Sequence, residues 1–229
     1  MKPLRDWDDL PDFMRTEEVR PYYDNLKKHE KALYLKRAFD VVAASILIVL
    51  LAPVMLVIAV WIKVDSPGPV FFRQTRITQY GNEFRIFKFR TMVNNADKMG
   101  TSVTVGGDSR ITHVGRVIRK YRIDEVPQLL NVFTGDMSFV GTRPEVEKYV
   151  NNYSDEWFAT LLVPAGITSE ASIKFKDEES ILDNSHDVDS AYLNLVLPEK
   201  MRWNLKSVEH YSFLNEIFIM IRTVIAVIC

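Results

Sequence analysis

The sequence predicts an α+β fold: a mostly helical, membrane-associated domain that carries a small β-hairpin or sheet. Residues 41–62 form an apolar run without a charge, long enough for a membrane helix. Two short segments rich in aromatic and β-branched residues flank a glycine-containing turn near residue 80, as in a hairpin. Later segments, among them 111–120 and 203–229, have a helical pattern, so helix is expected to outweigh strand.

Length and charge narrow the classes of protein further. The chain has 229 residues and a formal net charge of −1, which suits one domain with a real core, or a domain with an appendage. No overall positive field attracts nucleic acid, so nucleic acid is not expected as a partner. Cys229 is the single cysteine, so no disulfide can form within the chain, which fits a reducing cytoplasm. Residues 1–30 are polar and lack the apolar stretch of a secretory signal.

The apolar segment Val41–Ile62 would be about 33 Å long as a straight helix, enough to cross a bilayer core. Pro53 near its middle removes a backbone hydrogen bond and kinks the helix, at a cost of about 3 kcal/mol. Basic residues mark the cytoplasmic side of a membrane helix, and here they stand at both ends: Lys36, Arg37, Lys63, Arg73 and Arg76. A simple crossing satisfies this rule at one end only. A segment that enters and returns to the same leaflet satisfies it at both, and on these residues a kinked single span and a re-entrant helix remain open.

Shorter elements are expected to follow. Asp65–Pro69 has the composition of a turn, and Val70–Phe72 and Phe84–Phe89 are predicted strands on either side of Tyr80–Asn82. Residues 94–110 and the acidic stretch 176–190 are predicted loops.

Three helices are expected in the second half of the chain, over Ile111–Lys120, from Asp124 onwards and over Trp203–Cys229. The last has apolar residues at a spacing that suits the membrane interface. Packing against the protein's own core would explain the same spacing equally well.

The segment Arg119–Gln128 combines two carboxylates with basic residues. Proline in a helix is tolerated in the first turn, so Pro127 places Asp124 and Glu125 at or near a helix start. Free amides and the positive end of the helix dipole attract anions such as phosphate there. Adjacent carboxylates point about 100° apart on a helix, so one can attack a phosphorus while the other holds a metal ion. Taken alone, an acid at a helix start is more often a cap.

A glycine-flanked loop, Thr134–Pro144, follows shortly afterwards and contains Arg143. Glycine lets the backbone approach a phosphate closely, and arginine binds phosphate oxygens in a bidentate manner. The two features together favour a phosphate site over a simple helix cap.

In these motifs and in others along the chain, the sequence resembles the monotopic phosphoglycosyl transferases, the bacterial sugar transferase family. The matching stretches cover about residues 36–175: Lys36-Arg37 through Asp40, the apolar segment broken at Pro53, Gly68-Pro69-Val70-Phe71-Phe72, Phe87-Lys88-Phe89-Arg90-Thr91-Met92, Asp124-Glu125 with Pro127-Gln128, Asn131-Val132, Gly135-Asp136-Met137-Ser138, Val140-Gly141 with Arg143-Pro144, and Pro164-Ala165-Gly166-Ile167-Thr168.

The resemblance implies a re-entrant membrane helix and a catalytic Asp-Glu dyad assisted by Mg²⁺. Asp124 would attack the β-phosphate of a UDP-sugar, release UMP and form a covalent sugar-phosphate intermediate. A polyprenyl phosphate, such as undecaprenyl phosphate, would then accept the sugar phosphate. Glu125 would help to hold Mg²⁺, while Lys88, Arg119 and Arg143 would stabilise phosphate charge.

The resemblance also implies a location. The protein would contact membrane lipids at the cytoplasmic face of the bacterial inner membrane and carry out the first membrane step of a glycoconjugate pathway. A homodimer is compatible with the sequence. Four parts are expected: a polar N-terminal extension (1–35), the re-entrant helix with its flanks (36–66), a catalytic domain (67–200) and a C-terminal interfacial helix (201–229). The short extension resembles the small, catalytic-core form of the family.

Three positions depart from the family pattern. Thr78 stands where a glycine is usual and Thr142 where a proline is usual, and Ser169-Glu170 follow the Ile-Thr pair in place of Gly-aromatic or Gly-Leu. The last departure bears on which sugar is bound, and the reaction is not affected by it.

Two other functions compete with this interpretation. A non-enzymatic membrane scaffold needs the apolar helix but no Asp-Glu pair with basic residues around it. A phosphohydrolase with an aspartyl nucleophile places Asp-x-Asp at the end of an apolar strand, whereas Asp124-Glu125 precedes Pro127 at a helix start. Release of UMP would distinguish the transferase from a membrane scaffold. A requirement for a lipid acceptor would distinguish it from a phosphohydrolase.

Overall fold

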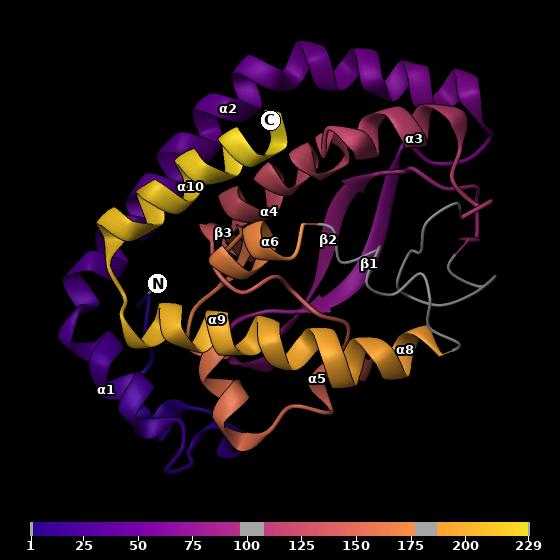
Figure 1. Cartoon of the computed structure of the whole chain (residues 1–229). Coiled ribbons are helices and arrows are strands. Elements are labelled where there is room, and N and C mark those ends of the chain that lie inside the picture. The colour runs from indigo at the N-terminus through magenta and orange to yellow at the C-terminus, as the bar shows by residue number, and fades with distance from the viewer. Residues whose placement is uncertain (1, 97–107, 177–186, 229) are drawn as a thin grey trace.

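The computed structural model describes residues 2–96, 108–176 and 187–228. Helices enclose two small β-sheets, so the predicted α+β, mainly helical class is confirmed. The long helix α2 (Glu30–Asp65) runs along the outside of the molecule (Figure 1). The other α-helices in the described ranges are α1 (Arg20–Lys28), α3 (His113–Lys120), α4 (Leu129–Thr134), α5 (Glu147–Val150), α6 (Glu170–Lys174), α8 (Val188–Ala191), α9 (Leu197–Glu209) and α10 (Phe213–Ile228).

The predicted hairpin is present and is longer than expected. Strand β1 (Phe71–Ile77) pairs antiparallel with β2 (Glu83–Phe89), with Phe71 opposite Phe89 and Ile77 opposite Glu83. A short 3₁₀ turn, η3 (Gln79–Gly81), joins them. Two consecutive residues of this turn, Tyr80 and Gly81, have positive φ angles of 61° and 75°.

A second sheet was not predicted. Strands β3 (Met137–Val140) and β4 (Ala165–Thr168) form a parallel pair. The two four-residue strands are separated by α5 and by the 3₁₀ segment η6 (Asp155–Leu162). Such short strands carry no clear alternation of apolar and polar residues, and only their pairing identifies them.

Helix α2 continues through Pro53 as one element. Figure 1 shows that it rises and then turns to run along the top of the molecule, so the expected break is a change of direction within the helix. Among the described residues, α2 is the one helix long and apolar enough to cross a membrane, and only 11% of its most apolar 18-residue stretch is buried. A core helix of a soluble protein would be mostly buried.

The first half of α2 packs on β2, α4 and β3. Ala44 lies in one small core with Phe84, Ile86, Val132 and Met137. The Arg37 guanidinium donates to the carbonyls of Val132, at 2.7 Å, and of Phe133, at 3.0 Å, near the end of α4.

The last part of α2 packs on α3 and on the end of β2. Ile58 and Ile62 share a second small core with Phe89, Val114 and Ile118. Asp65 accepts a hydrogen bond from the amide of Val114 at 3.1 Å, at the start of α3. Both ends of α2 are therefore fixed to one body, and the exposed residues Val49, Leu50, Val54, Leu56 and Val57 lie between them.

The N-terminal extension is folded into the largest core. Leu4, Met14 and Leu26 are fully buried, together with residues of η6 and α9. Two 3₁₀ segments, η1 (Trp7–Asp9) and η2 (Asp12–Met14), precede α1. The segment is polar in composition, and several of its apolar residues point inward, although Phe13 is 42% exposed.

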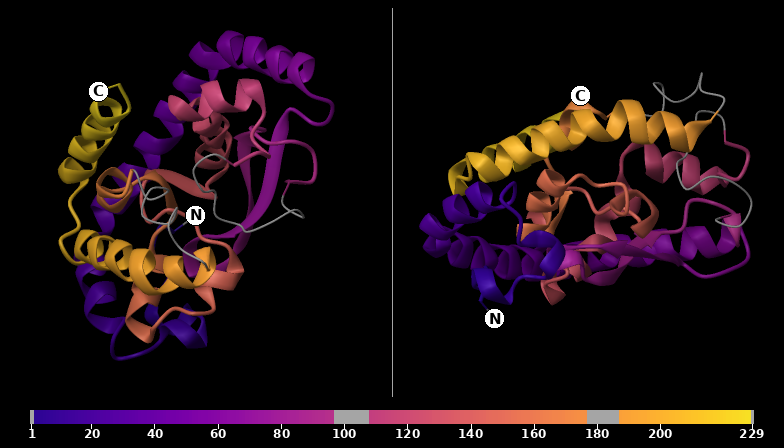
Figure 2. Two further views of the ribbon diagram at one scale, coloured as in Figure 1. Left: turned by 45° about the vertical axis from the view of Figure 1, so that its right-hand side comes forward. Right: turned by 90° about the horizontal axis from the view of Figure 1, so that it is seen from below.

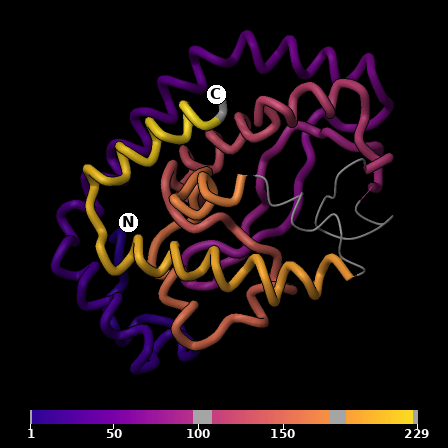
Figure 3. The backbone as a smooth tube through the Cα atoms, in the orientation of Figure 1, coloured from indigo at the N-terminus to yellow at the C-terminus, as the bar shows by residue number. Residues whose placement is uncertain are grey.

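The C-terminal region is two helices, where the sequence predicted one continuous helical segment from Trp203. Helix α9 ends at Glu209 and α10 begins at Phe213. Tyr211 lies between them and is buried in the large core, so the chain changes direction around an anchored side chain. Figure 3 shows the turn between the two helices, and Figure 2 shows α10 from two further sides.

Helix α3 confirms the prediction for Ile111–Lys120 apart from its first two residues. Thr112 caps it by accepting a hydrogen bond from the amide of Gly115. The helix expected from Asp124 begins as the 3₁₀ segment η5 (Ile123–Gln128) and becomes α-helical only at Leu129. Most of the loops expected at 94–110 and 176–190 lies outside the described residues. The loop prediction is wrong at the end of the second stretch, where α8 begins at Val188 and is capped by Asp187.

Candidate active site

Four of the predicted site residues meet around one carboxylate. Lys88 on β2 lies with its Nζ 3.0 Å from Glu125 Oε1. Arg143, after β3, donates to the same oxygen and reaches Oε2 at 3.4 Å. Asp124 and Glu125 stand together on η5, and each is only 8% exposed. The site is thus built from a strand, a 3₁₀ segment and a loop that are far apart in the sequence.

A backbone turn before η5 positions the two acids. Arg122 adopts a left-handed conformation (φ 51°), which few non-glycine residues do, and its carbonyl accepts a hydrogen bond from the amide of Glu125 at 3.2 Å. Pro127 lies inside the 3₁₀ segment that follows, two residues before the α-helix α4 begins at Leu129.

Asn131 on α4 fixes η5 and α4 against the hairpin. Its side-chain oxygen accepts the amide of Phe87 at 2.8 Å, and its nitrogen donates to the carbonyl of Arg85 at 3.1 Å. Asn131 is 1% exposed, so these bonds form without competition from water. They fix the position of α4 relative to β2, the strand that carries Lys88.

Two glycines place the loop that carries Arg143. A Cβ atom on Gly166 would lie 2.1 Å from the amide nitrogen of Gly141, and one on Gly141 would lie 2.4 Å from the carbonyl oxygen of Pro164. Only residues without a side chain allow this approach. Two hydrogen bonds cross the contact, from Gly141 to Thr168 at 3.0 Å and from Gly166 to Thr142 at 2.9 Å.

The two acids have opposite electrostatics. Burial would raise the pKa of Glu125, but Arg143 and Lys88 outweigh it and hold the pKa of that carboxyl well below its usual range. Burial raises the pKa of Asp124, and the neighbouring Glu125 adds to this against the influence of Lys88, Arg119 and Arg143. Burial also lowers the pKa of the Lys88 ammonium.

The partners of Asp124 and Glu125 differ in the same way. Glu125 receives two cations, whereas no donor in the described ranges forms a hydrogen bond with the Asp124 carboxylate. Within the described residues, the oxygens of Asp124 are therefore not engaged, whereas the neighbouring carboxylate is.

The remaining predicted residues take different positions. Arg119 lies near the end of α3 and lowers the pKa of Asp124 from a distance. Pro53 lies on the exposed middle of α2 and is not part of this site.

Magnesium fits the chemistry of this pair of acids. Mg²⁺ usually binds one or two carboxylates and completes its shell with water and substrate phosphate. Among the described residues, Glu125 Oε2 accepts only the 3.4 Å contact from Arg143, and Asp124 is the preceding residue of the chain. No group of three or more His, Cys, Asp or Glu side chains that could hold a metal occurs in the described part of the chain. A site completed by the substrate is consistent with these donors.

Residues that depart from the family pattern have structural partners. Thr78 Oγ1 donates to the carbonyl of Asp136 at 2.6 Å and accepts the amide of Ala165 at 3.1 Å, next to the second sheet. Ser169 caps α6, and Glu170 pairs with Arg222 of α10 at 2.6 Å. Thr142 forms the backbone bond to Gly166 described above.

Sequence reasoning missed a second charged cluster beside the site. Glu145, Lys200 and Tyr192 are buried, and Arg76 was noted only as a basic residue after the apolar segment. Glu145 stands directly after Arg143-Pro144, which could have drawn attention to it. Lys200 lies on α9 with no motif around it.

Comparison with known proteins identifies the family to which this chain is similar. A family model described as bacterial sugar transferase matches residues 31–229. UDP-N-acetylgalactosamine-undecaprenyl-phosphate N-acetylgalactosaminephosphotransferase of Aeromonas hydrophila is 45% identical over 143 residues, which are 61% of this chain and 34% of the relative. UDP-glucose:undecaprenyl-phosphate glucose-1-phosphate transferases are similar too. That of Caulobacter vibrioides is 45% identical (61% of this chain, 53% of the relative) and that of Escherichia coli is 41% identical (70% and 35%).

The chain spans between about a third and a half of the length of these relatives. The family match nevertheless begins in the first turn of α2 and includes both acids and all the cations around them. The chain therefore belongs to the bacterial sugar transferase family.

Proposed function

We propose that this protein is a phosphoglycosyl transferase, which moves a sugar-1-phosphate from a UDP-sugar to a polyprenyl phosphate such as undecaprenyl phosphate and releases UMP. The names of the relatives support UDP-sugars and undecaprenyl phosphate as the substrate classes. The observation that carries the proposal is the asymmetric pair of buried acids: Glu125 is held by Lys88 and Arg143, whereas Asp124 receives no hydrogen bond from the described residues. The reaction would begin the membrane-bound assembly of a bacterial glycoconjugate.

The transfer takes place in two displacements. A carboxylate oxygen of Asp124 forms a bond to the β-phosphorus of the UDP-sugar, and the bond from that phosphorus to the bridging oxygen breaks. UMP leaves with the bridging oxygen and its electron pair. An oxygen of the lipid phosphate then attacks the same phosphorus, and the Asp124 carboxylate is released. No general base is required, since a carboxylate is ionised near neutral pH.

The cations of the site lower the charge that builds up on the phosphoryl oxygens. Lys88 and Arg143 contact the neighbouring Glu125, and these two cations and Arg119 all favour the charged form of Asp124. Arginine and lysine clamps of this kind stabilise transferring phosphoryl groups. Mg²⁺, held by Glu125 together with phosphate oxygens, would supply further charge neutralisation.

The attachment of α2 supports a re-entrant arrangement in the membrane. A helix that crosses a bilayer puts its ends on opposite sides, about 30 Å apart. Here Ala44, near the start of the apolar segment Val41–Ile62, and Ile62, at its end, pack on the same body. We therefore place both ends of α2 on the cytoplasmic face of the inner membrane, with the exposed middle around Pro53 embedded in the lipid. The apolar outer face of α10 is placed at the membrane interface.

The test is a screen of UDP-sugars with undecaprenyl phosphate, in which UMP is measured. Wild-type enzyme given UDP-sugar and Mg²⁺ without lipid should gain the mass of a sugar phosphate on the peptide that contains Asp124. Asp124→Asn should release no UMP. Direct transfer is indicated instead if UMP appears only after the lipid binds and no adduct can be trapped. Release of free sugar phosphate to water at the full rate without lipid would indicate a phosphohydrolase.

A further inference from the structure

A second buried carboxylate, Glu145, lies two residues beyond Arg143 and has no part in the proposed chemistry. It is 6% exposed. Tyr192 Oη donates to its Oε1 over 2.5 Å, Lys200 Nζ lies 3.8 Å from the same oxygen, and Arg76 Nη1 lies 3.9 Å from Oε2. Lys200 also donates to Tyr192 Oη at 3.1 Å. The side chains around Glu145 thus come from β1, from the π-helical turn η7 (Tyr192–Val196) and from α9.

Arg143 and Glu145 belong to one short segment, separated by Pro144. A residue before proline is restricted to extended backbone, and side chains two positions apart on such backbone point to the same side. The segment from 143 to 146 is neither helix nor paired strand. Arg143, which contacts Glu125, also lines one small cavity together with Glu145.

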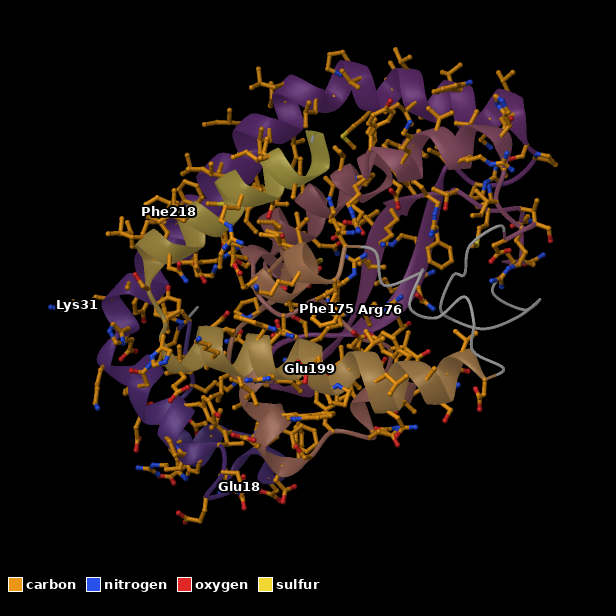
Figure 4. All side chains as sticks on the ribbon, in the orientation of Figure 1. Glu18, Lys31, Arg76, Phe175, Glu199 and Phe218 are labelled. Carbon is orange, nitrogen blue, oxygen red and sulfur yellow. The ribbon has the colours of Figure 1, made fainter. Side chains whose placement is uncertain are left out.

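Arg76 lies beside Glu145 and the segment that carries Arg143. Its Nη1 donates to the carbonyl of Pro144 at 3.1 Å, and its pKa, which burial lowers, also responds to both Glu145 and Arg143. Figure 4 shows Arg76 in the interior of the molecule, above α9 and close to the loop that carries Arg143. The site and the Glu145 cluster are one continuous electrostatic system.

Among the described residues, two cations lie at each of these two acids. Lys88 and Arg143 contact Glu125, while Arg76 and Lys200 flank Glu145. Lys200 is 4% exposed, so its charge is compensated by protein groups more than by water. A buried carboxylate that loses a neighbouring cation attracts the nearest cation that can move. Arg143 is that cation, since Arg76 already lies at Glu145.

We propose that Lys200 is a positioning residue, which neutralises Glu145 and thereby keeps Arg143 on Glu125. Its influence on catalysis rests on the function proposed above. Lys200 never touches the substrate in this scheme. It determines which of two buried acids the phosphate-binding arginine pairs with.

Lys200→Met tests the proposal, because it keeps the side chain's length and removes its charge. Turnover per folded enzyme, followed as UMP release by the whole chain, should fall between about 10- and 100-fold, as expected when a catalytic group is misplaced by about 1 Å. Lys200→Arg keeps the charge and should retain most of the activity. Lys206→Met makes the same substitution at an exposed lysine of the same helix and should change nothing.

Two double variants separate positioning from simple support of the fold. In an Arg143→Ala background Lys200→Met should cause no further loss, because no arginine remains to be displaced. Glu145→Gln combined with Lys200→Met removes both charges and should restore turnover toward the wild-type value. Losses that multiply in the first double variant, or no recovery in the second, would overturn the proposal.

Unfolding measurements test the placement of Arg143 without using activity. In a double-mutant cycle, Arg143→Ala and Glu145→Gln should be weakly coupled in the wild type and more strongly coupled in Lys200→Met, where Arg143 has moved to Glu145. Equal coupling in both backgrounds would contradict the placement. A wild-type protein that released no UMP from any UDP-sugar would refute the proposed function alone, since this cycle still decides where Arg143 lies.

Discussion

Asp124 and Glu125 are neighbours in the chain and equally buried, but their surroundings differ. Glu125 is contacted by an ammonium and a guanidinium, and Asp124 receives no hydrogen bond from the described residues. A buried anion without donors is costly, and such a cost is typical of a group that must react. In the reaction proposed above, this difference between two adjacent side chains suits Asp124 to be the nucleophile and Glu125 to be an anchor for cations.

Asp124→Asn should abolish turnover and stabilise the fold. The pKa of Asp124 is raised, so its ionised form destabilises the folded state above that pKa. The amide removes this penalty, and the gain in free energy of unfolding should be on the order of 1 kcal/mol near pH 7. As the pH falls through the raised pKa, the wild-type carboxyl takes up a proton in the folded state and the advantage of the amide shrinks.

Denaturant unfolding at a series of pH values measures this difference. Asp155→Asn, at an exposed acid in the first turn of η6, is the matched control and should leave stability nearly unchanged. An Asp124→Asn protein that was less stable than wild type at neutral pH would show that burial is not the dominant influence on this carboxyl.

Arg143→Ala should lower turnover by about 10²–10³-fold, because electrostatic contacts to a transferring phosphoryl group contribute this much. Membrane association, measured by flotation with vesicles, should be unaffected, since Arg143 lies in the site and away from the exposed part of α2. Arg202→Ala, at an exposed arginine of α9, serves as control. Normal kinetics in Arg143→Ala would remove this residue from the site.

At the scale of elements, α2 is the helix on which the membrane proposal depends. Its two ends are held by short polar contacts, Arg37 to the end of α4 and Asp65 to the start of α3. Arg90 adds two further bonds, to the carbonyls of Ser66 and Pro67, at 2.7 Å each. These contacts fix the exits of the helix in relation to the catalytic loops.

Single cysteines at Lys31 and at Lys63, in a Cys229→Ser background, should both react with an impermeant thiol reagent from the cytoplasmic side only. Both positions are exposed, and Figure 4 shows Lys31 pointing away from the protein. Inverted and right-side-out membrane vesicles provide the two directions of access. Labelling of one of them from the periplasmic side would contradict the re-entrant arrangement and indicate a kinked single span.

Elements with a local pattern were predictable, and elements made by distant contacts were not. The hairpin and α3 follow from alternation and from the cap at Thr112. The β3–β4 pair depends on the approach of Gly141 to Gly166, and the turn between α9 and α10 depends on burial of Tyr211. Each of these two features depends on residues that are far apart in the chain, so neither can be predicted from a short stretch of sequence.

The site was likewise predictable only where its residues lie in local motifs. Lys88, Asp124, Glu125 and Arg143 lie in motifs that resemble those of the family, and the structure brings these four together. The partners of Glu145 come from β1, η7 and α9, and nothing in the sequence around Lys200 connects it with a residue near 145.

For the whole molecule, the N-terminal extension is part of the main core. Leu26 is fully buried beside residues of η6 and α9, so Leu26→Ala should lower the free energy of unfolding by about 2–5 kcal/mol. Turnover per folded molecule should stay near the wild-type value, because the extension does not reach the acids. Leu195→Ala, at a 61% exposed leucine, should change stability by about 0.5 kcal/mol or less.

Chemical unfolding followed by tryptophan fluorescence gives the two stabilities, and the UMP assay gives the turnover. A Leu26→Ala protein as stable as wild type would mean that the extension is only loosely attached. A large loss of turnover at full stability would mean instead that the extension acts on the site.

The attachment of α2 at both ends has a consequence for how the second substrate is found. In the proposed membrane arrangement, a body joined to the bilayer by two anchors can still rock about the line between them. The apolar outer face of α10, on which Figure 4 shows Phe218, supplies a third point of support away from that line. Three supports define a plane, so the acids stay at one height above the lipid headgroups. The polyprenyl phosphate then reaches them by lateral diffusion in two dimensions, and the enzyme need not extract it from the bilayer.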